Sequence, residues 1–134
     1  MYALKTSVQK ILLIDADEDD QFIFEHILRE VAPFIHLKVR SSEEGIEEVV
    51  KQWQPDLIFL DINLPMDGGI PCLKKLQQCS DSQLSPVIIY SSLYNQKVVE
   101  KAFELGAVHF VQKVDHYAEV KKVLCGLLEM PRRA

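Results

Sequence analysis

Short apolar runs alternate with longer segments of helical periodicity along the chain. The runs lie at residues 10–14, 36–40, 57–61, 86–91 and 108–112. Runs of this length, without strict alternation of apolar and polar positions, are typical of strands buried on both faces of a parallel sheet. The pattern therefore predicts five strands, each followed by a segment with helical spacing.

The segments between the runs carry apolar residues three or four positions apart, as amphipathic helices do. Three such faces are Phe24-Ile27-Leu28-Val31, Val98-Ala102-Leu105 and Tyr117-Val120-Leu124-Leu127. The order βαβαβαβαβα predicts an α/β fold, in which a doubly wound five-stranded parallel sheet has helices on both faces.

Local signals mark where several of these helices begin and end. Ser41 and Glu44 have the spacing of a capping box, which predicts that the second helix starts there. Pro33 predicts the end of the first helix. Gly106 follows Leu105 as a glycine does after the last turn of a helix.

Composition narrows the class of protein. The 134 residues fit one domain. A net charge of −5 argues against nucleic-acid binding, and the lack of a long apolar stretch argues against a signal peptide or a membrane span. Three cysteines without metal-ligand spacing indicate reduced thiols in a cytoplasmic protein.

Polar residues follow four of the five predicted strands. Asp15 and Asp61 follow the first and third strands, Ser91-Ser92 end the fourth, and Lys113 follows the fifth. Because the carboxyl ends of parallel strands meet at one edge, we expect these side chains to converge. Clustered carboxylates favour a hard cation such as Mg²⁺. An aspartate can attack phosphorus, while lysine and hydroxyl groups can bind phosphoryl oxygens.

With these residues in place, the chain resembles the receiver domain of two-component response regulators over about residues 8–130. The matching segments are Ile11–Asp15, Leu57–Pro65, Pro86–Ser92 and Gly106–Lys113. The resemblance implies a flavodoxin-like sheet with strand order 2-1-3-4-5. It also implies that residues 1–134 form a single receiver domain without an output domain.

The resemblance implies a role for each matched residue. Asp61 would be the phosphoacceptor, with Lys113 and Ser91 as its catalytic partners. Ser91 and Phe110 would be the switch residues that respond to the phosphoryl group. The expected reaction is confined to phosphotransfer to Asp61 and its dephosphorylation, so the chain would not be an enzyme with a separate substrate.

The resemblance also implies a Mg²⁺ site made by Asp15, Asp61 and the backbone carbonyl of Asn63. The family usually has two adjacent acids after the first strand, and here the second position is Ala16. Asp17, one residue further on, is a candidate replacement. We expect Ala16 to weaken Mg²⁺ binding.

Simpler interpretations of the same residues stay open. Asp61 could cap the turn that follows it, and Ser91-Ser92 could cap the next helix. The acids at 17–20 could be first-turn residues favoured by the helix dipole, which is the interpretation we take for Asp19 and Asp20. Phe110 could belong to the core.

The expected function is that of a phosphoacceptor response regulator. A histidine kinase or phosphotransfer protein would phosphorylate Asp61 and thereby switch a surface over the fourth helix, fifth strand and fifth helix. A downstream protein would bind that surface, and the chain would be a monomer or weak homodimer. The alternative, motivated by Ala16, is a degenerate receiver that binds proteins independently of phosphorylation. A Mg²⁺-dependent phosphohydrolase is disfavoured, because Asn63 stands where those enzymes usually have a second acid.

Overall fold

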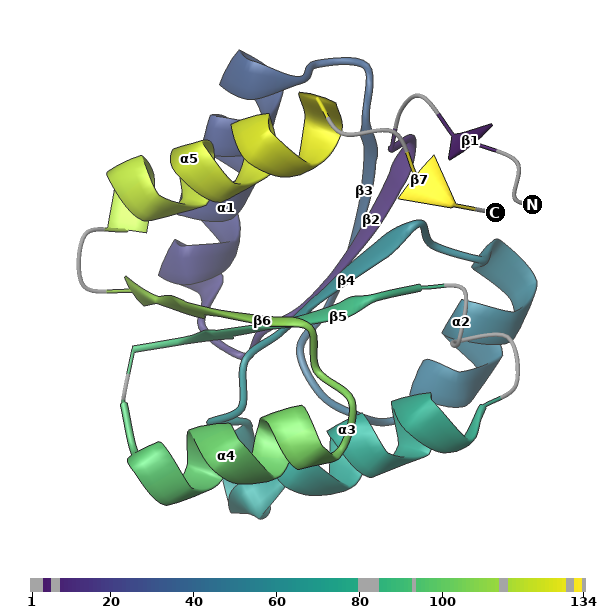
Figure 1. Ribbon diagram of the computed structural model, residues 1–134, viewed down its shortest axis with the longest axis vertical. Coiled ribbons are helices and arrows are strands. Elements are labelled where there is room, and N and C mark those ends of the chain that lie inside the picture. Colours follow the sequence, from purple (N-terminus) through teal and green to yellow (C-terminus); the bar gives the residue numbers. More distant parts are fainter. Residues whose placement is uncertain are drawn as a thin grey trace.

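Five parallel strands run side by side through the middle of the molecule (Figure 1). The computed structural model describes residues 4–5, 8–79, 85–92, 94–113, 116–129 and 132–133. The strands are β2 (Lys10–Ile14), β3 (His36–Arg40), β4 (Leu57–Leu60), β5 (Val87–Ser91) and β6 (His109–Gln112). Their order is β3-β2-β4-β5-β6, which is 2-1-3-4-5 when only these strands are counted. The predicted sheet is therefore confirmed.

Helices cover both faces of this sheet, as predicted. One face is covered by α1 (Glu18–Val31) and α5 (His116–Glu129), which pack together (Figure 1). The other face is covered by α2 (Ile46–Trp53), α3 (Gly69–Gln78) and α4 (Gln96–Glu104). The fold class is confirmed as a doubly wound α/β sheet.

Alternation along the strands divides the interior into two cores. In β2, Ile11 and Leu13 face the layer of α1 and α5, whereas Leu12 and Ile14 face the layer of α2, α3 and α4. All four are 0% exposed, which is why the run reads as apolar throughout. The first core contains a cluster of three rings packed edge to face, formed by Phe24, Phe59 and Tyr90.

The helix limits agree with the sequence signals except at α2. α1 ends at Val31, just before Pro33, and Gly106 follows α4 with a φ of +102°. The predicted start of α2 at Ser41 is wrong, since the helix begins at Ile46. The hydroxyl of Ser42 instead accepts a bond from the Glu44 amide in a turn, and Gly45 adopts a left-handed φ of +69° before the helix.

Two small elements were not predicted. β1 (Leu4–Lys5) pairs antiparallel with β7 (Arg132–Arg133), which brings the two ends of the described chain together. A short 3₁₀ helix, η1 (Pro65–Asp67), lies in the connection between β4 and α3. Within the described residues, no helix has the length and apolar character needed to cross a membrane.

Candidate functional site

Two aspartates extend neighbouring strands at the carboxyl edge of the sheet. Asp61 follows β4, and its amide donates to the Ile14 carbonyl at 2.8 Å. Asp15 follows β2, and its amide donates to the Arg40 carbonyl at 2.9 Å. These backbone bonds continue the sheet ladder by one residue. The register of the parallel strands therefore fixes both acids at the edge where the sequence predicts a site.

Both aspartates make the same local turn. The Oδ1 atom of Asp15 accepts a bond from the Asp17 amide at 2.9 Å, and Oδ1 of Asp61 accepts one from the Asn63 amide at 2.8 Å. Each acid thus turns the chain with one carboxylate oxygen. The second oxygen of each, Oδ2, is directed to Lys113.

Lys113 lies at the centre of the site. Its ammonium nitrogen is 2.7 Å from Asp15 Oδ2, 3.0 Å from Asp61 Oδ2 and 2.8 Å from Asp20 Oδ2. The same nitrogen lies 4.6 Å from the centre of the Tyr90 ring, so Tyr90 of the core aromatic cluster makes a cation–π contact with the lysine. One ammonium therefore holds three carboxylates.

Burial and charge act in opposite directions on these groups. Burial raises the pKa of Asp15, and the hydrogen bond from Lys113 only partly offsets it. Burial alone would lower the pKa of Lys113, but hydrogen bonds to Asp15 and Asp20 and the charge of Asp61 raise it to about 12. Lys113 is therefore a permanent cation at neutral pH.

Asp20 is the functional-site residue that sequence reasoning missed. It belongs to the first turn of α1, and we expected only a favourable interaction with the helix dipole. Its contact with Lys113 shows that this interpretation was incomplete. Asp17 has a different position, because it is exposed and its Oδ1 accepts a bond from the Asp20 amide at 3.0 Å as the N-cap of α1. The spacing of Asp17 and Asp20 is the signal that separates the cap from the inward acid.

Ser91 reaches the site through Asn63. Ser91 is fully buried at the end of β5, and the side-chain amide of Asn63 donates to its hydroxyl. The backbone amide of Asn63 is bound to Asp61 at the same time. The alternative that Ser91 or Ser92 caps the next helix is wrong, because α4 begins at Gln96 and Asn95 is its N-cap.

Phe110 lies on β6 beside a cavity of about 160 Å³. The cavity extends from Ile62 and Asn63, in the loop after β4, to the α4 side chains. The Phe110 ring is partly buried and packs edge to face on Tyr94, with 5.7 Å between ring centres. Phe110 is thus both a core-contacting residue and a neighbour of the loop that carries Asp61.

Comparison with known sequences identifies the family. The sequence profile of the response regulator receiver domain matches residues 11–124. The chain belongs to this family. Receivers of this kind are the input domains of two-component response regulators, and the predicted resemblance is confirmed.

The receiver shares about a quarter to a third of its residues with individual relatives. It is 32% identical over 131 residues to a protein-glutamate methylesterase/protein-glutamine glutaminase of Myxococcus xanthus, covering 95% of this chain and 36% of that protein. It is 26% identical to the probable C4-dicarboxylate response regulator DctR of Priestia megaterium, and the match covers 85% of this chain and 49% of that protein. The receiver thus spans only part of the length of these curated relatives.

Solved structures share the fold of this receiver. The Mn²⁺-bound form of response regulator Rcp1 superposes with a TM-score of 0.84 at 22% identity, covering 94% of this chain and 99% of that one. The phosphorylated cyanobacterial phytochrome response regulator RcpA gives a TM-score of 0.73 at 20% identity, covering 90% and 91%. At these identities the likeness concerns the fold.

The acidic site of the receiver has the charge that a divalent cation requires. Within the described part of the chain, no three acid, histidine or cysteine side chains are grouped as a ready metal site, and the Lys113 ammonium lies between the carboxylates. Three carboxylates around one ammonium nevertheless leave a net charge of −2 when all are ionised. This oxygen-rich donor set fits a hard cation such as Mg²⁺.

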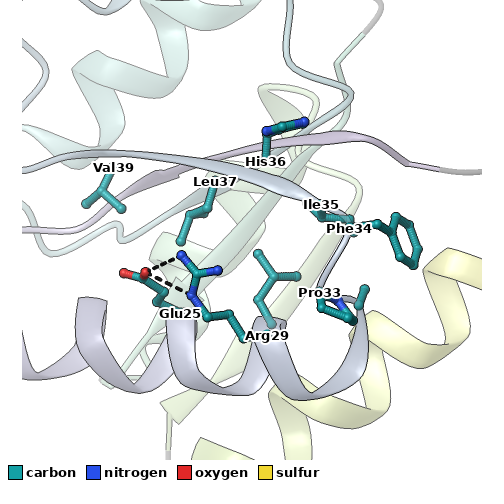
Figure 2. Close-up of a pocket in the computed structure, with 10 residues that line it drawn as sticks. Glu25, Arg29, Pro33, Phe34, Ile35, His36, Leu37 and Val39 are labelled. Carbon is teal, nitrogen blue, oxygen red and sulfur yellow. Dashed lines mark hydrogen bonds and ion pairs between the residues drawn. The ribbon is translucent and has the colours of Figure 1, made fainter.

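A larger cavity, of about 360 Å³, lies between α1 and the edge strand β3 (Figure 2). Its wall includes Leu37 and Val39 of β3, and the ion pair of Arg29 with Glu25, at 2.9 Å, lies along α1 (Figure 2). None of the site acids lines it, so it has no direct part in the chemistry of Lys113 and its carboxylates.

Proposed function

We propose that this receiver accepts a phosphoryl group on Asp61 in a two-component phosphorelay. The observation that carries the proposal is the difference in access between the two carboxylates on Lys113 that directly follow a strand. The Asp15 side chain is 0% exposed, whereas that of Asp61 is 11% exposed. A phosphodonor must reach the attacking oxygen in an aligned geometry. Asp61 is therefore suited to be the nucleophile, and Asp15 to be a supporting charge.

In the proposed reaction, a carboxylate oxygen of Asp61 attacks the phosphorus of a phosphohistidine on a histidine kinase or phosphotransfer protein. The P–O bond forms as the P–N bond breaks, and the imidazole of the donor leaves. The Lys113 ammonium, 3.0 Å from Asp61 Oδ2, is placed to pair with a phosphoryl oxygen. The product is an aspartyl phosphate.

Mg²⁺ is the cofactor we propose, held by Asp15, Asp61 and the backbone carbonyl of Asn63. When bound, it would supply positive charge to the transferring phosphoryl group. Support comes from the excess of carboxylates over ammonium groups at this edge. Rcp1, which shares the fold, was solved in a Mn²⁺-bound form.

Phosphorylation would act on the protein through Ser91 and Phe110. The phosphoryl group adds roughly −1.5 to −2 charges. The Ser91 hydroxyl would move from the Asn63 side chain to a phosphoryl oxygen, and Phe110 would respond through the adjacent cavity. The surface over α4, β6 and α5 would then bind a downstream protein.

The proposed scope of the activity is narrow. The receiver would catalyse only phosphotransfer to Asp61 and its dephosphorylation, as a cytoplasmic monomer or weak homodimer. Several curated relatives are protein-glutamate methylesterases, and this chain spans 36% of the Myxococcus protein. The methylesterase activity of that protein is not part of the proposed function, which involves only residues at the edge of the sheet.

Incubation with acetyl phosphate and Mg²⁺, followed by intact-mass spectrometry, tests the proposal. We expect the wild type and Asp19→Asn, a charge-matched control in the exposed first turn of α1, to gain one phosphoryl group. Asp61→Asn should gain none, and EDTA should abolish labelling of the wild type. Labelling of Asp61→Asn at the wild-type level would overturn the proposal.

A degenerate receiver that binds partners without phosphorylation is the second candidate. It is favoured by Ala16, whose side chain offers no oxygen and packs against the core of α2, α3 and α4. If the folded wild type is not labelled at any Mg²⁺ concentration, this second function is the better one.

A further inference from the structure

The first turn of α1 sends one of its acids into the candidate site. Asp20 Oδ2 lies 2.8 Å from the Lys113 ammonium, and the Asp20 side chain is 23% exposed. The helix dipole alone does not explain this position, because it favours every acid of the first turn equally. Asp19, in the same turn, is exposed. The contact with Lys113 therefore distinguishes Asp20 from its neighbours.

The two residues nearest Asp15 cannot provide a further carboxylate as they stand. Ala16 has no side-chain oxygen and packs against the core. Asp17 is exposed and holds the N-terminus of α1 through the Asp20 amide, 3.0 Å from its Oδ1. The turn that leaves the Asp17 side chain exposed to solvent directs the Asp20 side chain toward Lys113.

We infer that Asp20 supplies the acidic group that Ala16 lacks, and that its carboxylate contributes to divalent-cation binding together with Asp15 and Asp61. Asp20 is what raises the number of carboxylates on Lys113 from two to three. With Asp20 ionised the group carries −2, and without it −1. Because cation affinity for an oxygen site rises with the number of ligand charges, this third acid is expected to matter.

The inference rests on the proposed function for the location of the metal, but its test does not require phosphorylation. Mg²⁺ binding by the unphosphorylated full chain is measured by isothermal titration calorimetry, and Mn²⁺ binding by the loss of the free-ion paramagnetic resonance signal. The variants are Asp20→Asn, Asp17→Asn and Asp19→Asn. Each removes one negative charge from the same turn, and Asn at position 17 keeps the N-cap because it caps as well as Asp.

We expect Asp20→Asn to weaken Mg²⁺ and Mn²⁺ binding about tenfold, in the range seen when supporting groups of metal sites are removed. Asp17→Asn and Asp19→Asn should stay within about twofold of the wild type, since exposed charges further from the site are screened by solvent. Equal affinities for Asp20→Asn and the wild type would overturn the inference. So would an equal loss in Asp17→Asn, or a wild type that binds neither ion.

A rescue variant separates a ligand role from a merely structural one. In the double variant Ala16→Asp/Asp20→Asn, the restored acid at position 16 should recover most of the lost affinity. Urea unfolding shows whether each variant is folded before titration. A folded double variant that binds as weakly as Asp20→Asn would count against the inference.

Acetyl phosphate labelling distinguishes this inference from the proposed function. A wild type that binds Mg²⁺ with the predicted dependence on Asp20, but is not labelled, would refute phosphorylation and leave the role of Asp20 intact. A wild type that is labelled on Asp61, with Mg²⁺ affinity independent of Asp20, would refute the inference alone.

Discussion

Lys113 and Asp15 lie 98 residues apart in the chain, and the lysine ammonium is 2.7 Å from Asp15 Oδ2. The Asp15 side chain is 0% exposed and that of Lys113 is 3% exposed. This pair connects the residue after β2 with the residue after β6, across the carboxyl edge of the sheet. Both the stability of the folded protein and the chemistry of the site depend on Lys113, because its ammonium also pairs with Asp20 and Asp61.

Lys113→Met should lower the free energy of unfolding of the metal-free protein by about 3 kcal/mol at pH 7, because it leaves a buried carboxylate without its cation. Urea unfolding in EDTA, followed by circular dichroism, measures the change. Lys121→Met is the control, since Lys121 pairs with Glu30 at the surface and its removal should have little effect. Equal stability of Lys113→Met and the wild type would contradict the prediction.

The alkaline stability of the protein should also depend on Lys113. Its pKa is raised from 10.5 to about 12 by Asp15, Asp20 and Asp61. A raised pKa in a lysine means that the folded state binds the proton more tightly, so its contribution to stability is complete below pH 10.5 and is lost as the pH rises through about 12. The unfolding free energy of the wild type should therefore fall more steeply over this window than that of Lys113→Met. Parallel curves for the two proteins would show that Lys113 is not the titrating group.

Two variants of Asp17 should show whether its N-cap hydrogen bond or its negative charge stabilises α1. Asp17→Ala removes the bond to the Asp20 amide and should cost about 1 kcal/mol of stability, whereas Asp17→Asn should cost little. Thermal and urea unfolding of the three proteins measure both effects. If the two variants are destabilised equally, the charge of Asp17, and not its hydrogen bond, stabilises α1.

Ala16→Asp should tighten Mg²⁺ binding several-fold, because it adds a carboxylate directly after Asp15. Ala16→Asn is the control of similar size without the added charge, and it should leave the affinity close to that of the wild type. Calorimetric titration of both variants measures the change. Unchanged or weaker binding by Ala16→Asp would contradict the prediction and mean that a carboxylate at position 16 does not reach the bound ion.

The sheet and its polar edge could be predicted from the sequence, because both depend on pattern rather than on side-chain detail. Strands that are buried on both faces appear in the sequence as apolar runs. Because the strands are parallel, the residues that follow them, Asp15, Asp61 and Lys113, lie at one edge of the sheet. Ser91 followed from the same reasoning. These predictions needed only the order of strands and the residue after each.

The contacts that were missed depend on local backbone angles. Helix α2 begins at Ile46, later than predicted, because Gly45 takes a left-handed φ of +69°. The role of Asp20 depends on which acid caps α1, since a cap at Asp17 directs the residue three positions later to Lys113. The bond from Asn63 to Ser91 depends in turn on the Asp61 turn. Apolar periodicity carries no information on these choices.

Gly69, the first residue of α3, should be the least replaceable glycine near the site. A Cβ at this position would lie 1.8 Å from the carbonyl oxygen of Ile62, and the oxygen cannot move without shifting the backbone between Asp61 and Asn63. Gly69→Ala should therefore cost about 2 kcal/mol or more of stability, in the range of overpacked sites. It should also slow labelling of Asp61 by acetyl phosphate, because the loop that carries the acid is displaced.

Gly126→Ala is the matched control for this substitution. Gly126 lies within α5, and a Cβ there would face open space. Alanine in the interior of a helix is favoured over glycine by roughly 0.5–1 kcal/mol, so this variant should be slightly more stable than the wild type and should be labelled at the same rate. Urea unfolding and labelling kinetics of both variants measure these effects. A Gly69→Ala protein that matches Gly126→Ala in stability would show that the loop after β4 can yield, and that close packing of α3 against Ile62 does not position Asp61.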